Sequence, residues 1–136
     1  MCGIFGLISA EAVDNQKLQK LANHARQRGR DSSGLFFFDD KKYYVERADY
    51  DINKLIANKN WSNSKLVMGH SRLITNGLSD NQPVVRDGYC LIHNGIIVND
   101  EDIWRNIDVE RKFDIDSEAI IGVAIQHLSE GADVED

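Results

Sequence analysis

The alternation of hydrophobic and polar positions along the chain predicts a mixture of strands and helices. Residues 1–9 are apolar and β-branched and include two glycines, which predicts a buried strand that another backbone or a ligand approaches closely. From Glu11 to Arg26, apolar residues recur at spacings of three and four, the pattern of a helix with one packed face. The same pattern predicts a last helix from Glu118 to about Leu128.

The middle of the chain contains shorter elements separated by turn-forming residues, and two hairpins are predicted there. The first joins strand-like residues 35–38 and 43–45. The second joins residues 89–93 and 96–98 through Asn94-Gly95, a dipeptide favoured where both turn residues need positive φ. Other predicted elements are a turn at residues 28–34, a short helix at 51–59, a strand at 65–70 and a loop at 75–83.

Two helix starts carry residues that commonly cap helices. Asn99 or Asp100 is expected to cap a helix that ends at Ile107, and Asp116-Ser117 is expected to cap the last helix. The strands and helices together predict an α+β fold.

Composition and charge restrict the class of protein. The chain has 136 residues, which fits one domain, and 42% of them are hydrophobic, which suits a folded globular chain. The 16 basic and 22 acidic residues give a net charge of −6 without a basic run, so nucleic-acid binding is not expected. No apolar stretch approaches the ~20 residues that span a bilayer, and the start lacks a secretory signal pattern, so we expect no membrane association and a cytoplasmic location.

Cys2 is the most informative single position. It follows the initiator methionine and precedes a glycine, so removal of Met1 would expose a residue that carries both a thiol and an α-amine. An α-amine has a pKa of about 8 and can act as a base near neutral pH, so one residue could supply a nucleophile and its base. The alternative is a small buried hydrophobic residue at the start of a strand, which is the ordinary place for a free cysteine.

Five motifs together carry a family resemblance. They are residues 1–6, 28–34, 69–77 and 93–97 and the Asp-Ser-Glu run at 116–118. In this order they resemble the class II glutamine amidotransferase domain of the N-terminal-nucleophile hydrolases. The resemblance covers nearly the whole chain and implies an αββα four-layer sandwich. Because family domains usually continue beyond the Asp-Ser-Glu helix, residues 1–136 are expected to form a partial domain, truncated at its C-terminal end and lacking the acceptor domain.

The resemblance implies roles for three residues in bond making. Cys2 matches the family nucleophile, and its freed amine matches the group that passes the proton to the leaving ammonia. The side chain of Asn94 and the backbone N–H of Gly95 match the donors that stabilise the oxyanion of the tetrahedral intermediate. The alternative for Asn94-Gly95 is an ordinary hairpin turn.

The resemblance also implies residues that bind the amino-acid head of glutamine. Arg72 matches the group that binds the α-carboxylate, a task that suits the planar guanidinium, and Asp116 matches the acid that pairs with the α-ammonium. Thr75 and Asn76 follow on the same loop and are expected to add polar contacts. The alternatives are a surface arginine at position 72 and a helix cap at Asp116, which can serve as cap and ligand together.

Other positions near these motifs are expected to support the site. Arg28, Gly29 and Asp31 match a family signature, for which we expect a salt-bridge and turn role. Some family members have an aromatic residue where this chain has Leu73, so an ammonia gate would differ here. The four histidines lack the spacing of metal ligands, so no metal, no cofactor and no catalytic histidine is expected.

Three hypotheses of function follow. The first is hydrolysis of L-glutamine to L-glutamate and ammonia through a Cys2 thioester, with the ammonia passed to an acceptor synthase domain or subunit. The second is a non-catalytic, truncated amidotransferase-like binding module. The third is hydrolysis of other amides or peptides by the same nucleophile. The acceptor and the oligomeric state, which includes the option of a homo-oligomer, are left open.

Overall fold

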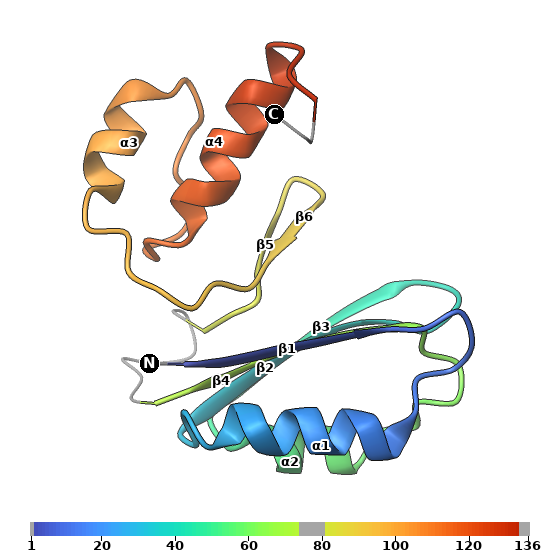
Figure 1. Cartoon of the computed structure of the whole chain (residues 1–136). Helices are drawn as coiled ribbons and strands as arrows, with labels where there is room; N and C mark the ends of the chain where they lie inside the picture. Colours follow the sequence, from blue (N-terminus) through green and yellow to red (C-terminus); the bar gives the residue numbers. More distant parts are fainter. Residues whose placement is uncertain (1, 74–80, 134–136) are drawn as a thin grey trace. The chain divides into compact units, whose positions relative to one another are not determined.

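The structure is a computed structural model that describes residues 2–73 and 81–133. The chain divides into two compact units (Figure 1). The first comprises Met1–Pro83 and Ile92–Gly95, and the second comprises Val84–Leu91 and Ile96–Asp136. Both strands and helices occur in each unit, as the α+β prediction requires.

The first unit is a four-stranded antiparallel sheet with two helices on one face (Figure 1). The strand order is β1-β4-β2-β3, so β1 and β3 form the edges. The elements are β1 (Gly3–Ile8), α1 (Asn15–Arg26), β2 (Ser32–Phe38), β3 (Tyr43–Ala48), α2 (Ile52–Ala57) and β4 (Leu66–Arg72).

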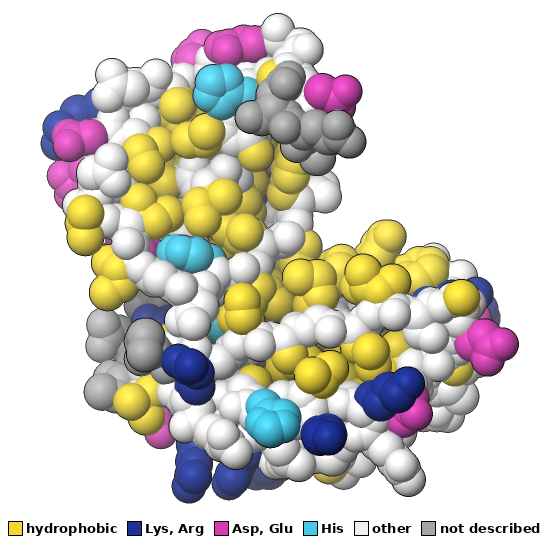
Figure 2. Space-filling model, viewed as in Figure 1, with side chains coloured by type: hydrophobic (Ala, Val, Ile, Leu, Met, Phe, Trp, Pro, Cys, Tyr) yellow, Lys and Arg dark blue, Asp and Glu magenta, His cyan; other side chains and the backbone are white. Residues whose placement is uncertain are grey.

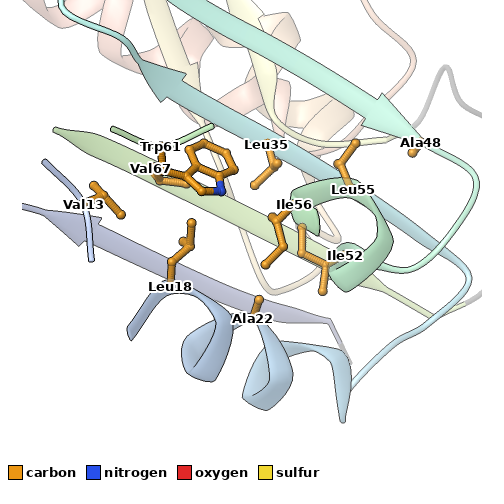
Figure 3. Packing of buried hydrophobic residues seen from close by; sticks show 10 residues of the cluster. All are labelled: Val13, Leu18, Ala22, Leu35, Ala48, Ile52, Leu55, Ile56, Trp61 and Val67. Carbon is orange, nitrogen blue, oxygen red and sulfur yellow. The ribbon is translucent and has the colours of Figure 1, made fainter. Parts of the chain in front are cut away.

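The core of this unit lies between the sheet and the two helices. Leu18 of α1 and Ile52 and Ile56 of α2 point toward the sheet, where they meet Val67 of β4 (Figure 3). Burial of such side chains is the main term that stabilises a small domain, at about 1.5–3 kcal/mol for each large aliphatic side chain. Ten buried residues form this cluster: Val13, Leu18, Ala22, Leu35, Ala48, Ile52, Leu55, Ile56, Trp61 and Val67.

Helix α1 begins later than the hydrophobic pattern predicts. The carboxylate of Asp14 accepts hydrogen bonds from the backbone N–H of Gln16 at 2.8 Å and of Lys17 at 3.1 Å. An aspartate in this position satisfies N–H groups that have no partner within the helix. The helix therefore starts at Asn15 rather than at Glu11.

Strand β1 is an edge strand whose residues alternate between covered and exposed, so the prediction of a buried first strand is wrong. Ile4 is 49% exposed and Ile8 is 81% exposed, on the face opposite α1, because successive side chains of a strand point to opposite faces. Figure 2 shows hydrophobic side chains on the surface of this unit. A close approach to Gly3 is confirmed, since a Cβ there would collide with the backbone of Ala25 in α1.

The second unit contains a short hairpin and two helices. Its hairpin turns at Asp87 and Gly88, whose φ values of 49° and 86° favour an Asp-Gly dipeptide. A small cluster of Val84, Ile115 and Ile121 forms its core. The elements are β5 (Val84–Arg86), β6 (Tyr89–Leu91), α3 (Asp100–Asn106) and α4 (Glu118–Ser129).

The predicted hairpin at Asn94-Gly95 is wrong, because residues 92–99 form a loop and no strand occurs at 96–98. The polar groups of this segment have other partners: the side chain of Asn94 bonds to Cys2, and the N–H of Ile97 bonds to the carboxylate of Asp116. Those groups are not available for a strand ladder. The segment instead presents Asn94 and Gly95 in an irregular loop.

The predicted cap positions are confirmed, since Asn99 and Ser117 are the N-cap residues of α3 and α4. Neither residue makes a side-chain capping bond, so the capping interaction itself is not formed. Asp116 uses its carboxylate differently, since Oδ1 accepts from the N–H of Ser117 and Oδ2 from the N–H of Ile97.

Candidate active site

Cys2 and Asn94 are 92 positions apart in sequence and meet in the first unit. The backbone nitrogen of Cys2 donates to Oδ1 of Asn94 at 3.1 Å. Cys2 is half buried at the start of β1, and Asn94 is exposed on its loop. Because Oδ1 is the acceptor, the amide nitrogen Nδ2 of Asn94 can donate to a further group. The nucleophile and the oxyanion donor inferred from the sequence are therefore side by side.

Arg72 lies next to Cys2 because of the strand register. Gly3 pairs with Ser71 in the antiparallel β1–β4 ladder, so the preceding Cys2 and the following Arg72 are the next residues at the same end. Side chains alternate along a strand, and Gly3 faces α1, so both Cys2 and Arg72 belong to the opposite face. A thiol and a guanidinium thus share one end and one face of the sheet.

The 28–31 turn supports the end of β4. The N–H of Asp31 donates to the carbonyl of Arg72 at 3.0 Å, and the hydroxyl of Ser71 donates to the carbonyl of Gly29 at 2.6 Å. A Cβ at Gly29 would collide with the backbone of Arg72, so only glycine allows this approach. Arg28 is exposed, and its N–H donates to the carbonyl of Ala25. The turn role expected for this motif agrees with these contacts, and its salt bridge stays a prediction.

The loop that carries Asn94 and Gly95 is held by a residue that the sequence analysis did not single out. The side-chain oxygen of Gln82 accepts a hydrogen bond from the N–H of His93 at 2.5 Å. The imidazole of His93 lies over Gly95, where a Cβ would come 2.5 Å from Nε2. Gln82 is only 7% exposed. Nothing in the sequence around Gln82 indicates this role, because the partner His93 lies 11 positions further along the chain.

His70 is buried behind the same end of the sheet. Its side chain is fully buried, on the face that Arg72 shares, and neither ring nitrogen has a hydrogen-bond partner among residues 2–73 and 81–133. Burial is the largest cause and the charge interactions with Arg72 and His93 are smaller ones, and together they lower the pKa of His70 to about 4. His70 is therefore neutral at pH 7.

We expect the buried His70 to make the free energy of unfolding depend on pH. The unfolded chain, with a His pKa of about 6.5, takes up the proton before the folded chain does, whose His70 pKa is about 4. The contribution of neutral His70 to the free energy of unfolding is therefore fully present above pH 6.5. It falls by about 3 kcal/mol as the pH is lowered toward 4. Urea unfolding of the wild type and of His70→Leu at several pH values measures it.

The informative quantity in that experiment is the difference between the two chains. A stability difference that shifts by about 3 kcal/mol between pH 7 and pH 4 assigns the effect to His70, because the other titrating groups are common to both proteins. A constant difference across this range contradicts the prediction.

Asp116 lies in the second unit, where a buried ion pair fixes its surroundings. Glu118 is fully buried and accepts from Nη1 of Arg86 at 2.5 Å and from the N–H groups of Lys112 and Phe113 at 3.0 and 2.8 Å. A buried carboxylate with this many donors holds the segment before α4 in place. Asp116 is thereby positioned two residues before Glu118, with its carboxylate bonded to the N–H of Ile97 at 2.7 Å.

Some of the expected site residues and groups are outside what the structure describes. Thr75 and Asn76 belong to residues 74–80, and Met1 is also outside the described residues.

Within residues 2–73 and 81–133, no three His, Cys, Asp or Glu residues are grouped so that they could hold a metal ion. In the same part of the chain, no helix is long and apolar enough to cross a membrane.

Comparison with known proteins gives relatives among the glutamine–fructose-6-phosphate aminotransferases. The chain is 30% identical, over its whole length, to glutamine–fructose-6-phosphate aminotransferase (isomerizing) of Shouchella clausii strain KSM-K16, of which it covers 24%. It is 31% identical over its whole length to the enzyme of the same name from Bacillus licheniformis, again covering 24% of that protein. The chain thus spans about a quarter of the length of these relatives. No family model matches it.

Among solved structures, the chain matches glutamine phosphoribosylpyrophosphate amidotransferase from B. subtilis, complexed with ADP and GMP. The TM-score is 0.68 with 21% sequence identity, and the match covers 92% of this chain and 29% of that chain. This match confirms the fold that the resemblance implied. The chain is therefore a relative of the class II glutamine amidotransferases, with the α+β fold of their N-terminal-nucleophile hydrolase domain.

Proposed function

We propose that the chain hydrolyses L-glutamine to L-glutamate and ammonia through a thioester on Cys2. The observation that carries this proposal is the hydrogen bond of 3.1 Å between the nitrogen of Cys2 and Oδ1 of Asn94. This bond brings Cys2, which carries the thiol and the adjacent nitrogen, next to Asn94, whose side-chain amide can donate a hydrogen bond. The reaction needs these three groups together.

Removal of Met1 turns the Cys2 nitrogen into an α-amine, and this amine starts the reaction. The amine takes the proton of the thiol, and the thiolate forms a bond to the carboxamide carbon of glutamine. The electron pair of the carbonyl moves onto its oxygen, and this oxyanion accepts hydrogen bonds from Nδ2 of Asn94 and the N–H of Gly95. The bond between Asn94 and the Cys2 nitrogen directs the amine toward the reacting centre.

Three further proton transfers complete the cycle. The ammonium of Cys2 donates its proton to the leaving nitrogen as the carbon–nitrogen bond breaks, which releases ammonia and leaves the thioester. The freed amine then takes a proton from water, and the resulting hydroxide attacks the thioester carbon. The carbon–sulfur bond breaks, glutamate departs, and the ammonium returns its proton to the thiolate, which restores the thiol and the amine. The reaction needs no metal or redox step.

The remaining residues suit the amino-acid head of the substrate. Arg72 shares the end and the face of the sheet with Cys2, which supports the proposal that its guanidinium binds the α-carboxylate with two hydrogen bonds. Asp116 is proposed as the partner of the α-ammonium, with Thr75 and Asn76 adding contacts. The relatives' names describe aminotransferases, so we propose that the ammonia passes to an acceptor domain or subunit. A free thiol nucleophile suits a reducing cytoplasm.

Substrate selectivity tests this function through Arg72. In Arg72→Lys, we expect the KM for L-glutamine to rise about tenfold with kcat within about threefold, because lysine keeps the charge but loses the planar two-point contact. Glutamate release from glutamine measures both constants. A simple amide without an α-carboxylate, such as butyramide, is expected to be hydrolysed equally slowly by both chains.

The matched control is Arg105→Lys, in which an exposed arginine of α3 that pairs with Asp102 is changed in the same way. We expect its KM to stay within about twofold of the wild-type value. If the wild-type chain with Met1 removed releases no glutamate, the proposed function is wrong and a non-catalytic binding module becomes the better account. Efficient butyramide hydrolysis would favour a general amidase.

A further inference from the structure

We infer that Gln82 is a positioning residue for the oxyanion donors, which it fixes to the sheet that carries Cys2. The inference rests on the proposed function and adds a residue to it. Its starting observation is the hydrogen bond of 2.5 Å from the N–H of His93 to Oε1 of Gln82. His93 immediately precedes Asn94, so this bond fixes the backbone at the entry to the loop.

Gln82 can act in this way because its own backbone is anchored on both sides. Asn81 is 3% exposed, and its Nδ2 donates to the carbonyls of Ser33 at 3.1 Å and Ala48 at 3.2 Å. The Oδ1 of Asn81 accepts from the N–H of Gln82 at 3.1 Å. The guanidinium of Arg47 donates to the carbonyls of Asn81 and Pro83, at 3.1 Å from Nε to each. The segment 81–83 is thus bonded to strands β2 and β3.

A glycine in β2 allows this segment to lie directly on the sheet. A Cβ at Gly34 would collide with the carbonyl of Gln82, so any side chain there would lift the segment away. Gly34 pairs with His70 of β4, and His70 pairs with Ile4 of β1. Strand β2, which carries Gly34, is therefore the neighbour of β4, and β4 is the neighbour of β1, which begins just after Cys2.

These contacts connect the nucleophile and the oxyanion donors to a single rigid element. Cys2 directly precedes β1, which pairs with β4, and Asn94 is connected through His93 and Gln82 to strand β2 of the same sheet. Their separation is then held by hydrogen bonds to the sheet, including those of the Gln82 and Asn81 side chains, rather than by the exposed loop alone. Oxyanion stabilisation depends on donors that are already in place when the charge develops.

The test compares Gln82→Met, which keeps the length of the side chain and loses the acceptor, with Gln82→Glu, which keeps an acceptor oxygen. We expect kcat for glutamine hydrolysis to fall about 10- to 100-fold in Gln82→Met, with KM within about threefold, and to be within about fivefold of wild type in Gln82→Glu. A residue that only stabilises the fold would not separate kcat from KM in this way.

Two further measurements identify the cause. Alkylation of Cys2 by iodoacetamide displaces iodide without forming an oxyanion, so its rate is expected to change less than about threefold in Gln82→Met. The amide of His93 is expected to exchange with solvent hydrogen at least about tenfold faster in Gln82→Met, while the amides of β4 exchange as in wild type. The matched control is Gln126→Leu, which removes the same kind of bond, here to the N–H of Asp108 at 2.9 Å, and is expected to leave kcat within about twofold.

An unchanged kcat in Gln82→Met, or unchanged exchange at His93, overturns the inference. A loss of kcat that Gln82→Glu does not recover at all also overturns it, provided that Gln82→Glu melts within a few degrees of wild type. A wild-type chain that releases no glutamate contradicts the proposed function instead. In that case the exchange at His93 alone decides whether Gln82 holds the loop.

Discussion

Cys2→Ala, once Met1 has been removed, is expected to hydrolyse L-glutamine at least about 1,000-fold more slowly than the wild-type chain. Alanine leaves the α-amine and the hydrogen bond to Asn94 in place but removes the only group that can form the thioester. The other groups of the site cannot replace it, because each of them binds or donates without attacking carbon. Glutamate release, followed with a coupled dehydrogenase, measures the effect, and intact mass confirms that Met1 is absent.

The chain supplies a matched control for this variant in its second cysteine. Cys90 lies in β6 of the second unit and is also a half-buried cysteine. Cys90→Ala is expected to keep kcat within about twofold of wild type. A glutamine-like electrophile should add one adduct to the wild type and to Cys90→Ala, and none to Cys2→Ala. Wild-type rates in Cys2→Ala would refute the thioester mechanism.

The elements with strong periodicity could be predicted from the sequence. The helix around Leu18 and the strand around Val67 follow from hydrophobic patterns that the structure buries in one cluster. The burial of β1 could not be predicted, because an apolar strand has the same composition in the middle of a sheet and at its edge. Whether Ile4 and Ile8 are covered depends on the strand order, which is a property of the whole fold.

The turn chemistry explains the misplaced hairpin. Asn94-Gly95 and Asp87-Gly88 are both favourable turn dipeptides, and local preference alone cannot rank them. The structure uses Asp87-Gly88 for the β5–β6 turn and leaves Asn94 for a bond to Cys2. Long-range contacts therefore decided the outcome.

For the candidate site too, the local motifs indicated some residues, and others could be recognised only from contacts made in the fold. The motif order suggested Cys2, Arg72 and Asn94, and the register of β1 with β4 and the bond to Asn94 place them in one unit. Gln82 could not be identified from the sequence because its partner His93 is not its neighbour in the chain, and the burial of His70 depends on how the whole sheet is covered. A buried glutamine that accepts from a loop N–H has no sequence pattern of its own.

Asn94→Asp is expected to lower kcat for glutamine hydrolysis about 100- to 1,000-fold with little change in KM. The substitution keeps an oxygen that can accept the 3.1 Å bond from the Cys2 nitrogen, so the loop can hold its position. It removes the Nδ2 donor and adds a negative charge where the oxyanion forms. The loss therefore falls on the transition state, which alone carries that charge, rather than on the bound substrate.

The control for Asn94→Asp is Asn60→Asp, in which an asparagine of the first unit accepts a bond from the N–H of Ser62 at 3.0 Å. This replacement also keeps its acceptor oxygen and adds the same charge, and it is expected to leave kcat within about twofold. The rate of Cys2 alkylation by iodoacetamide should stay within about threefold in Asn94→Asp, because that reaction forms no oxyanion. If instead Asn94→Asp raises KM and leaves kcat unchanged, Asn94 binds the ground state and the oxyanion must be stabilised by other donors, with the N–H of Gly95 the first to consider.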